Sequence, residues 1–146
     1  MAFDLWAALL ILNHSTRPVT LRNVTKICGR FTQKDDPESW VHPEDLENST
    51  IPPGSTFAIA GRGHWDHAKG TEGSFELYDR DMLIRKVHWD CPFKLTRKQR
   101  WPIKNKVDME GGSGTWEVKL SGGIFTEEYG PMGVVTIELG AHQIER

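Results

Sequence analysis

The stretch from Gly70 to Phe93 decides the fold: it reads Gly-Thr-Glu-Gly-Ser-Phe-Glu-Leu-Tyr-Asp over residues 70–79 and ends in His-Trp-Asp-Cys-Pro-Phe. Its side chains alternate between apolar and polar, which is the pattern of a strand with one buried face. We expect one strand over residues 74–78 and a second over 82–89, joined by the turn Asp79-Arg80-Asp81. The two strands are expected to form a β-hairpin.

The alternation also assigns the side chains of this hairpin to faces. Phe75 and Leu77 share the apolar face of the first strand, and that of the second carries Leu83, Val87 and Trp89. Trp89 is therefore expected to lie in the core. His88 falls on the opposite face, where a ligand can reach it.

Composition restricts the class of protein. The 146 residues are expected to form one domain, residues 1–146, because a chain of this length buries a sufficient core without a metal or several disulfides. A net charge of −2 and a pI near 6.3 argue against binding to duplex nucleic acid. Fourteen glycines and eight prolines favour a turn-rich β protein, and six tryptophans suit an interface with one wet and one apolar side.

Toward the N-terminus, two further strands are predicted. An apolar run over residues 3–12 and an alternating run over 19–28 are interpreted as a β-hairpin, with Val19, Leu21 and Ile27 on one face of its second strand. Residues 32–54 are polar and interrupted by prolines, so we expect a long loop with one helical turn at residues 43–46.

Short apolar runs separated by glycine turns predict more strands, at residues 55–60, 116–120 and 134–139. Between them we expect a loop over residues 61–73 and a basic stretch over 94–106. The expected fold is an all-β, single-domain antiparallel β-sandwich of about seven to nine strands.

Few residues point to catalysis. The motif His64-Trp65-Asp66-His67 resembles part of a zinc-binding sequence, but Arg62 stands where its first histidine belongs, so we expect a polar loop and no metal. Ser113 lies in a glycine turn without a recognisable base, and this turn lacks the lysine of a phosphate-binding loop. We therefore expect a protein without catalytic residues or cofactors, and not an enzyme.

The two cysteines, Cys28 and Cys91, are interpreted as free thiols, because the chain shows no recognisable signal peptide. Asp4 stands where a signal peptide is basic, and the apolar run that follows is too short to span a bilayer. Asp90 is expected to raise the pKa of the neighbouring Cys91 thiol. The expected location is the cytoplasm, or outside the cell after release without a signal peptide.

The central stretch also resembles the aegerolysin family. The resemblance rests on the glycine turn with its strand and on the Trp-Asp-Cys-Pro corner: Gly70, Thr71, Gly73, Phe75, Leu77, Asp79 and residues 89–92, followed by an aromatic residue. Supporting matches are Trp6, Gly29, Gly61 with Arg62, Asp66, and a final strand led by glycine over residues 133–139. The similarity spans nearly the whole chain.

This resemblance implies a small, non-enzymatic β-sandwich protein that binds membrane lipids. It implies recognition of sphingolipid-containing membranes, such as those with ceramide phosphoethanolamine or with sphingomyelin and cholesterol. It further implies a hemolysin-like protein that acts at membrane surfaces as the docking component of a two-component pore-forming cytolysin. The implied partner is a perforin-like (MACPF) protein, and nucleic acid is not an expected partner.

Candidate lipid-binding residues follow from the resemblance and from the physics of membrane interfaces. Aromatic side chains at a rim can enter the interface while Arg or Lys contacts the lipid phosphate. Trp6 fits the core as well as the rim, and Arg62 and Asp90 also fit structural roles that tie loops together. The candidates are Trp6, His88, Phe93, Lys69 and Arg97, with Arg62, Asp66, Trp65 and Asp90 as possible supporting residues.

Four positions depart from the family pattern. Cys28 and Phe93 stand where tryptophan is usual, Lys69 stands where an acidic residue is frequent, and Ala60 replaces a cysteine. The two lost tryptophans fall at positions expected to touch lipid, for which Trp40 and Trp65 could compensate. The alternative interpretation is a soluble β-sandwich module that recognises a sugar or a protein, its lipid site having drifted.

Overall fold

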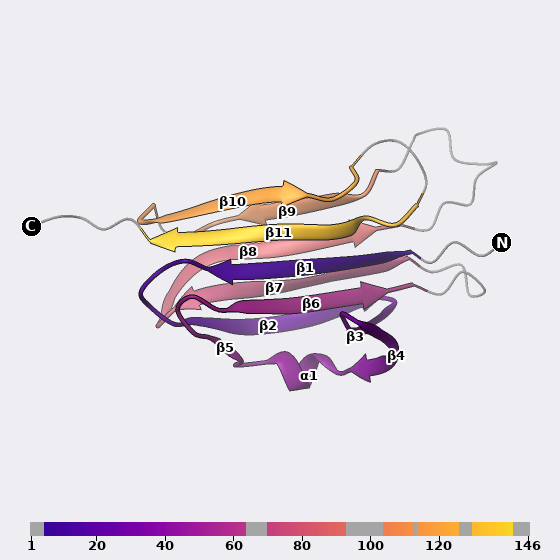
Figure 1. The fold of residues 1–146 in the computed structure, drawn as a ribbon, viewed down its shortest axis with the longest axis horizontal. Helices are drawn as coiled ribbons and strands as arrows, with labels where there is room; N and C mark the ends of the chain where they lie inside the picture. Colours follow the sequence, from indigo (N-terminus) through magenta and orange to yellow (C-terminus); the bar gives the residue numbers. More distant parts are fainter. Residues whose placement is uncertain (1–4, 64–69, 93–103, 113, 126–129, 142–146) are drawn as a thin grey trace, which may run out of the picture.

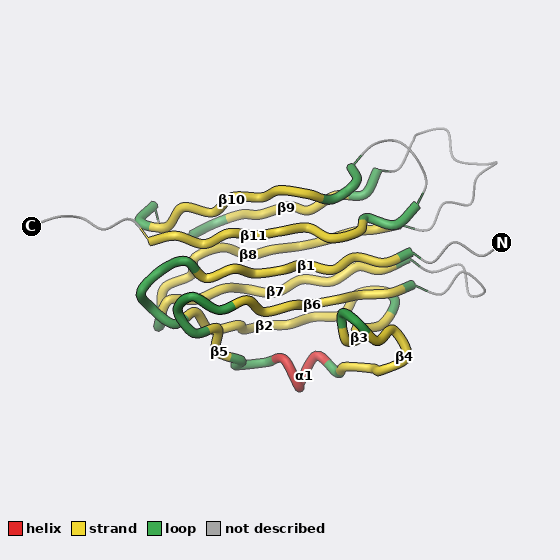
Figure 2. Tube along the Cα trace, in the orientation of Figure 1, coloured by secondary structure: helices red, strands yellow, loops and turns green. Residues whose placement is uncertain are grey.

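The computed structural model describes residues 5–63, 70–92, 104–112, 114–125 and 130–141, which form two β-sheets packed face to face (Figure 1). Strands make up most of this part of the chain, together with the short helix α1 (Pro43–Leu46), as Figure 2 shows. The expected all-β sandwich is confirmed. Eleven strands occur in the described residues, more than the expected seven to nine, because several short strands show no apolar alternation.

The first layer is a six-stranded sheet with the order β10-β11-β1-β6-β3-β4. Its neighbouring strands are antiparallel except β1 and β11, which run parallel. The strands are β1 (Trp6–Asn13), β3 (Arg30–Gln33), β4 (Asp36–Val41), β6 (Thr56–Arg62), β10 (Trp116–Gly122) and β11 (Gly133–Ala141).

The second layer is a five-stranded antiparallel sheet with the order β5-β2-β7-β8-β9. It contains the hairpin that the central stretch predicted. The strands are β2 (Val19–Cys28), β5 (Thr50–Ile51), β7 (Thr71–Asp79), β8 (Met82–Cys91) and β9 (Lys106–Glu110).

The core between the sheets is centred on Trp89, which is fully buried, as expected. Its ring centroid lies 5.4 Å from that of Phe31 in the six-stranded sheet and 6.2 Å from that of Phe75 in the five-stranded sheet. The indole Nε1 donates a hydrogen bond to Thr71 Oγ1 at 3.2 Å. A Cβ at Gly73 would overlap the indole ring, so the glycine makes room for the tryptophan. Packing thus explains why the central stretch combines these two residues.

The hairpin of β7 and β8 forms as predicted, but one side chain that was expected on the buried face of β8 is replaced there by its neighbour. Its turn places Arg80 at a φ of 57°. The pairing of the two strands is irregular between Leu77 and Tyr78, which shifts the alternation along β8. Ile84 is therefore fully buried, whereas Leu83, which was expected to face the core, is partly exposed.

The expected β-hairpin between the first two strands is wrong. β1 pairs with β6 and β11, whereas β2 pairs with β5 and β7 in the other sheet. Asn13 holds the crossing: its Nδ2 donates to the carbonyl oxygens of Arg17 and Ile51 at 2.8 and 2.9 Å, and its Oδ1 accepts two hydrogen bonds from Ser15. An apolar run indicates that a strand is buried but does not indicate which strand lies beside it.

β2 departs from its expected alternation at Asn23, which has a φ of 53°. The pairing with β7 shifts between Arg22 and Thr25, so the side chains that follow change face. As a result Ile27 is 52% exposed and does not share the buried face of Val19.

Much of the expected loop over residues 32–54 is regular structure. It contains part of β3, the whole of β4 and β5, and the predicted helical turn, which is confirmed as α1. β4 and β5 are edge strands, as is β9, for which no strand was expected. Edge strands have one partner and many exposed side chains, so their sequences lack the alternation of a half-buried strand.

Candidate functional site

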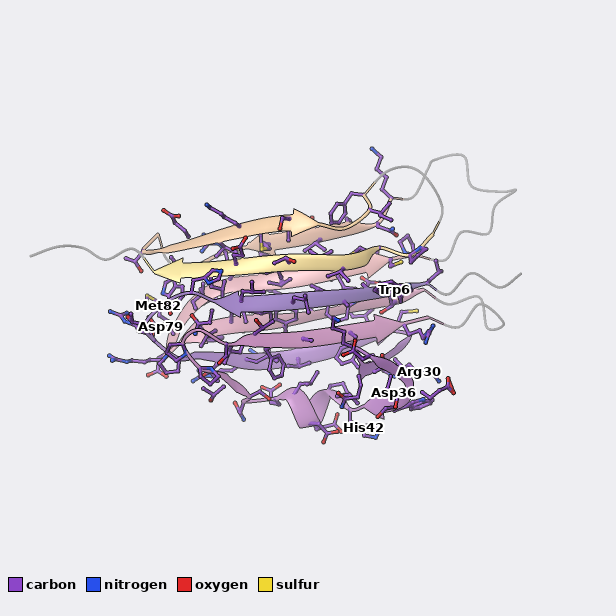
Figure 3. The ribbon with its side chains drawn as sticks, in the orientation of Figure 1. Trp6, Arg30, Asp36, His42, Asp79 and Met82 are labelled. Carbon is purple, nitrogen blue, oxygen red and sulfur yellow. The ribbon has the colours of Figure 1, made fainter. Side chains whose placement is uncertain are left out.

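A row of aromatic and cationic side chains crosses one end of the six-stranded sheet. Trp6 at the start of β1 is paired with Arg62 at the end of β6, and Arg62 is paired with Arg30 at the start of β3. Paired residues of neighbouring strands point to the same face, so these three side chains lie side by side. The residues next to them, Ala7 and Phe31, are buried in the core, which puts the row on the outer face. Figure 3 shows Trp6 and Arg30 at the same end of the molecule.

Trp40 on β4 extends this row. The guanidinium carbon of Arg30 lies 4.7 Å from the centroid of the Trp40 ring, a cation–π contact, and Trp40 remains 60% exposed. Within the described residues, the buried Nε of Arg30 has no hydrogen-bond partner. We refer to Trp6, Arg62, Arg30 and Trp40 as the end row.

A small hollow lies beside Trp6 on the same face. Its floor includes Ala8 and Ala60, whose short side chains leave a space of about 150 Å³. Its walls are formed by Trp6, Arg62, Thr32 and Lys34. The Nζ of Lys34 lies 3.2 Å from Asp35 Oδ1. An apolar floor, an indole, a hydroxyl and two cationic side chains can hold a small polar or anionic group.

The five-stranded sheet presents a different chemistry at the same end. Pairing of β2, β7, β8 and β9 sets Cys28, Glu72, Asp90 and Lys106 in one row across its outer face. Burial and the neighbouring Glu72 carboxylate raise the pKa of Asp90, whereas nearby cationic groups oppose that rise. This row thus carries two carboxylates and one lysine, whereas the end row carries two arginines.

His88 lies two residues before Asp90 on β8, so its side chain is on the same outer face and is paired with Asp108 of β9. Its Nε2 lies 2.7 Å from Glu72 Oε2, and its Nδ1 lies 3.7 Å from Asp108 Oδ2. The expectation that His88 points away from Trp89 is confirmed, because His88 is partly exposed while Trp89 is fully buried. The imidazole is held between two acidic side chains.

The structure therefore brings together only part of the predicted site. Trp6 is half-buried on the outer face and adjoins Arg62, while His88 and Asp90 lie on the outer face of the other sheet. Lys69, Trp65, Asp66, Phe93 and Arg97 lie outside the described residues. So does the histidine motif at residues 64–67; among the residues that are described, no cluster of His, Cys, Asp or Glu is arranged for a metal ion.

Three residues near this end, Arg30, Thr32 and Lys34, were not expected at a site, and Trp40 was expected only as a tryptophan that could compensate for the lost ones. Arg30, Thr32 and Lys34 lie in or beside a segment that was interpreted as a loop, and Trp40 was expected in that loop as well. Strand pairing brings them next to Trp6 and Arg62, which are distant in sequence. The sequence signal that could have located them was a single tryptophan, Trp40, within an otherwise polar segment.

The two cysteines differ sharply in environment. Both are free thiols, but Cys91 is fully buried while Cys28 is partly exposed. Burial raises the pKa of the Cys91 thiol to about 11, and the Asp90 carboxylate adds to the rise, as the sequence predicted. Because the thiolate is the reactive form, Cys91 stays protonated and shielded at pH 8.

We therefore expect iodoacetamide at pH 8 to modify Cys28 and to leave Cys91 unmodified in the folded protein. Both cysteines are expected to react once the protein is unfolded in guanidinium chloride, which provides the control. Peptide mass spectrometry distinguishes the two sites. Equal modification of both cysteines in the native protein would contradict the buried position of Cys91.

These features define a class: a small β-sandwich that presents an aromatic and cationic surface at one end. Within the described part of the chain, no helix is long and apolar enough to cross a membrane. A model of the aegerolysin family matches residues 4–142, and the chain belongs to this family. Aegerolysins are non-enzymatic lipid-binding proteins, so the chain is a hemolysin-like lipid-binding protein of that family.

Individual proteins show the same relationship over nearly the full length. The Asp-hemolysin of Aspergillus fumigatus is 28% identical over 141 residues, which are 95% of this chain and 94% of that protein. Ostreolysin A6 of Pleurotus ostreatus is 28% identical over 142 residues, 94% of this chain and 96% of that protein. The crystal structure of RahU protein in complex with a TRIS molecule has a TM-score of 0.83 at 26% identity, covering 97% of this chain and 98% of that one.

Proposed function

We propose that this protein recognises sphingolipid-containing membranes, with ceramide phosphoethanolamine or with sphingomyelin and cholesterol as the lipids, and acts at the membrane surface. We further propose that it is the docking component of a two-component cytolysin, with a perforin-like protein as the pore-forming partner. The observation that carries the proposal is the end row with its adjoining hollow, where Trp6, Arg62 and Lys34 surround a floor of two alanines.

This arrangement suits a phospholipid headgroup at a membrane interface. An indole ring is amphipathic and is favoured at the boundary between the apolar and wet regions, where Trp6 and the exposed Trp40 can insert. Guanidinium and ammonium groups form charge-assisted hydrogen bonds with phosphate oxygens, for which Arg62 and Lys34 are placed. Ala60 stands where the family usually has cysteine, and its small side chain contributes to the depth of the hollow.

Trp6→Ala is expected to weaken binding to liposomes roughly tenfold, because the interfacial burial of an indole contributes on the order of 1–2 kcal/mol. The measurement is co-sedimentation with liposomes that contain phosphatidylcholine and cholesterol plus either ceramide phosphoethanolamine or sphingomyelin. Met82→Ala is the matched control, since Met82 is 39% exposed and Figure 3 shows it at the opposite end from Trp6. Its affinity should equal that of the wild-type protein.

Thermal unfolding followed by circular dichroism verifies that both variants are folded. Loss of the folded transition in Trp6→Ala would mean that Trp6 is a core residue and that the site is misplaced. Absence of wild-type binding to every sphingolipid mixture would overturn the lipid proposal itself.

The docking role is tested separately by release of a fluorescent dye from the same liposomes. The protein alone is expected to bind without releasing dye, and release is expected when a perforin-like protein is added. Lysis of erythrocytes by the purified chain, in the absence of any partner, would contradict the docking role while leaving lipid recognition intact.

A further inference from the structure

A large groove lies beside the end row on the six-stranded sheet. It has a volume of about 740 Å³ and runs between β6 on one side and the segment of β3, β4 and α1 on the other. We call it the β6 groove. Four consecutive residues of β6, Phe57 to Ala60, line it. Its volume is within the range of sites that bind a ligand of several residues or rings.

The consecutive lining residues show that the edge of β6 itself faces the groove. Side chains of a strand alternate between two faces, so one face would contribute every second residue. β1 pairs with β6 along its whole length from Thr56 to Arg62, but β3 pairs only with Ala60, Gly61 and Arg62. Within the described residues, the edge of β6 over residues 56–59 therefore has no strand partner on the groove side. Its backbone N–H and C=O groups form a template for an additional strand.

The rim of the groove is acidic. Asp35, Asp36 and Asp45 line it, and all three are exposed. The one lysine of the lining, Lys34, is paired with Asp35 at 3.2 Å, so three aspartates against one lysine leave the lining two charges negative. Asp36 Oδ1 accepts a hydrogen bond from the backbone N–H of Glu38 at 3.1 Å, which uses one of its lone pairs.

Asp45 is placed in the same way, because its Oδ2 accepts a hydrogen bond from the backbone N–H of His42 at 3.2 Å. A carboxylate has about four acceptor positions, so both Asp36 and Asp45 keep capacity for a cationic ligand group. Phe57, Val41 and Leu46, each packed against the core, supply an apolar floor. The exposed Trp40 ring, which already contacts Arg30 on one side, stands beside it.

We propose that the β6 groove binds an extended, basic peptide segment of a partner protein, which adds to the free edge of β6 as a strand. The free edge of β6 supplies main-chain hydrogen bonds, which give affinity in this mode of recognition. Alternate side chains of the peptide then face opposite ways, so that lysines or arginines meet Asp36, Asp45 and the Trp40 ring while apolar side chains meet Phe57. This inference does not depend on the proposed lipid role.

The test uses a fluorescein-labelled seven-residue peptide of alternating lysine and valine, measured by fluorescence anisotropy with the full-length protein. It is expected to bind at least tenfold more tightly than the peptide of alternating glutamate and valine. A lysine–valine peptide with alternate backbone nitrogens methylated keeps its charge but cannot pair along its edge, and it is expected to lose at least tenfold. Equal binding of the methylated and unmethylated peptides would overturn strand addition.

The matched variants locate the binding site. Asp36→Asn with Asp45→Asn removes two charges while keeping the acceptor oxygens for Glu38 and His42, and is expected to weaken binding at least tenfold. Asp81→Asn with Glu110→Gln removes two charges from the other sheet and is expected to leave binding unchanged. Circular dichroism verifies that both double variants are folded. If the two double variants weaken binding equally, the peptide is attracted by the overall charge of the protein and not by the β6 groove, and the proposal fails.

A sugar is the competing occupant, since an exposed aromatic ring beside carboxylates is also compatible with an oligosaccharide. Binding of cellohexaose that is abolished by Trp40→Ala, together with equal affinities for the lysine and glutamate peptides, would replace the peptide proposal with a glycan site. Increased protection of the amides of residues 56–59 from hydrogen exchange on addition of the lysine peptide would support strand addition directly.

Discussion

Trp89→Ala is expected to lower the free energy of unfolding by about 3–5 kcal/mol, the usual cost of removing a fully buried large aromatic side chain. The indole contacts Phe31 in one sheet and Phe75 in the other, so its loss leaves a cavity between the layers. It also leaves Thr71 Oγ1 without the hydrogen bond from Nε1. Urea unfolding followed by circular dichroism measures the change.

The control for this substitution is Trp40→Ala, which removes the same side chain from a position that is 60% exposed. Its unfolding free energy should fall by less than about 1 kcal/mol, mainly through the lost contact with Arg30. If Trp89→Ala does not fold at all, Trp89→Phe keeps the comparison, with an expected loss of about 1–2 kcal/mol. Equal losses at Trp89 and Trp40 would contradict the assignment of Trp89 as the central core residue.

Asp79→Ala is expected to lower the free energy of unfolding by about 2–4 kcal/mol. Asp79 is 3% exposed at the end opposite to Trp6 (Figure 3), where its Oδ2 accepts hydrogen bonds from Arg17 Nη1 at 2.8 Å and from Trp116 Nε1 at 3.3 Å. Alanine leaves the buried indole N–H of Trp116 without its acceptor. Because Arg17 follows the crossing after β1 and Trp116 begins β10, this carboxylate joins three separate segments.

Asp81→Ala provides the control within the same turn. Its side chain is fully exposed and its contact is a 3.9 Å ion pair with Arg22, so its unfolding free energy should change by less than about 0.5 kcal/mol. Chemical denaturation of both variants at one pH and salt concentration gives the comparison. A change at Asp79 no larger than that at Asp81 would show that the buried network contributes nothing measurable.

Trp89 and Asp79 differ in how much of their surroundings can be predicted from the sequence. Trp89 was placed in the core because it continues an apolar alternation across a recognisable turn, and both features are local. Asp79 was expected as part of that turn and of the family motif, but not as a buried hydrogen-bond acceptor, since its partners Arg17 and Trp116 lie about 40 to 60 positions away in sequence and no local pattern joins them. Strand pairing, which brings such residues together, has no local signature in a chain of short strands.

The candidate site likewise contains residues that the sequence indicated and residues that only strand pairing brings together. Trp6 and Arg62 were selected from the sequence through family resemblance, and they prove to be neighbours because β1 and β6 pair in register. His88 was selected because it faces away from Trp89, which is confirmed, yet it lies on the other sheet between Glu72 and Asp108. Arg30 went unrecognised, and Trp40 was named only as a loop tryptophan that could compensate for the two lost ones, because β3 and the edge strand β4 lack the apolar alternation of a half-buried strand.

The sequence by itself determined the fold class, the central hairpin, the core position of Trp89 and the family, because each depends on local alternation, on turn glycines or on residues recognised in order along the chain. The tertiary structure decided that the first two strands lie in different sheets, where β2 changes face, and which side chains meet at the end row and along the β6 groove. Those features depend on contacts between strands that are distant in sequence, and such contacts are selected by the packing of the whole sandwich.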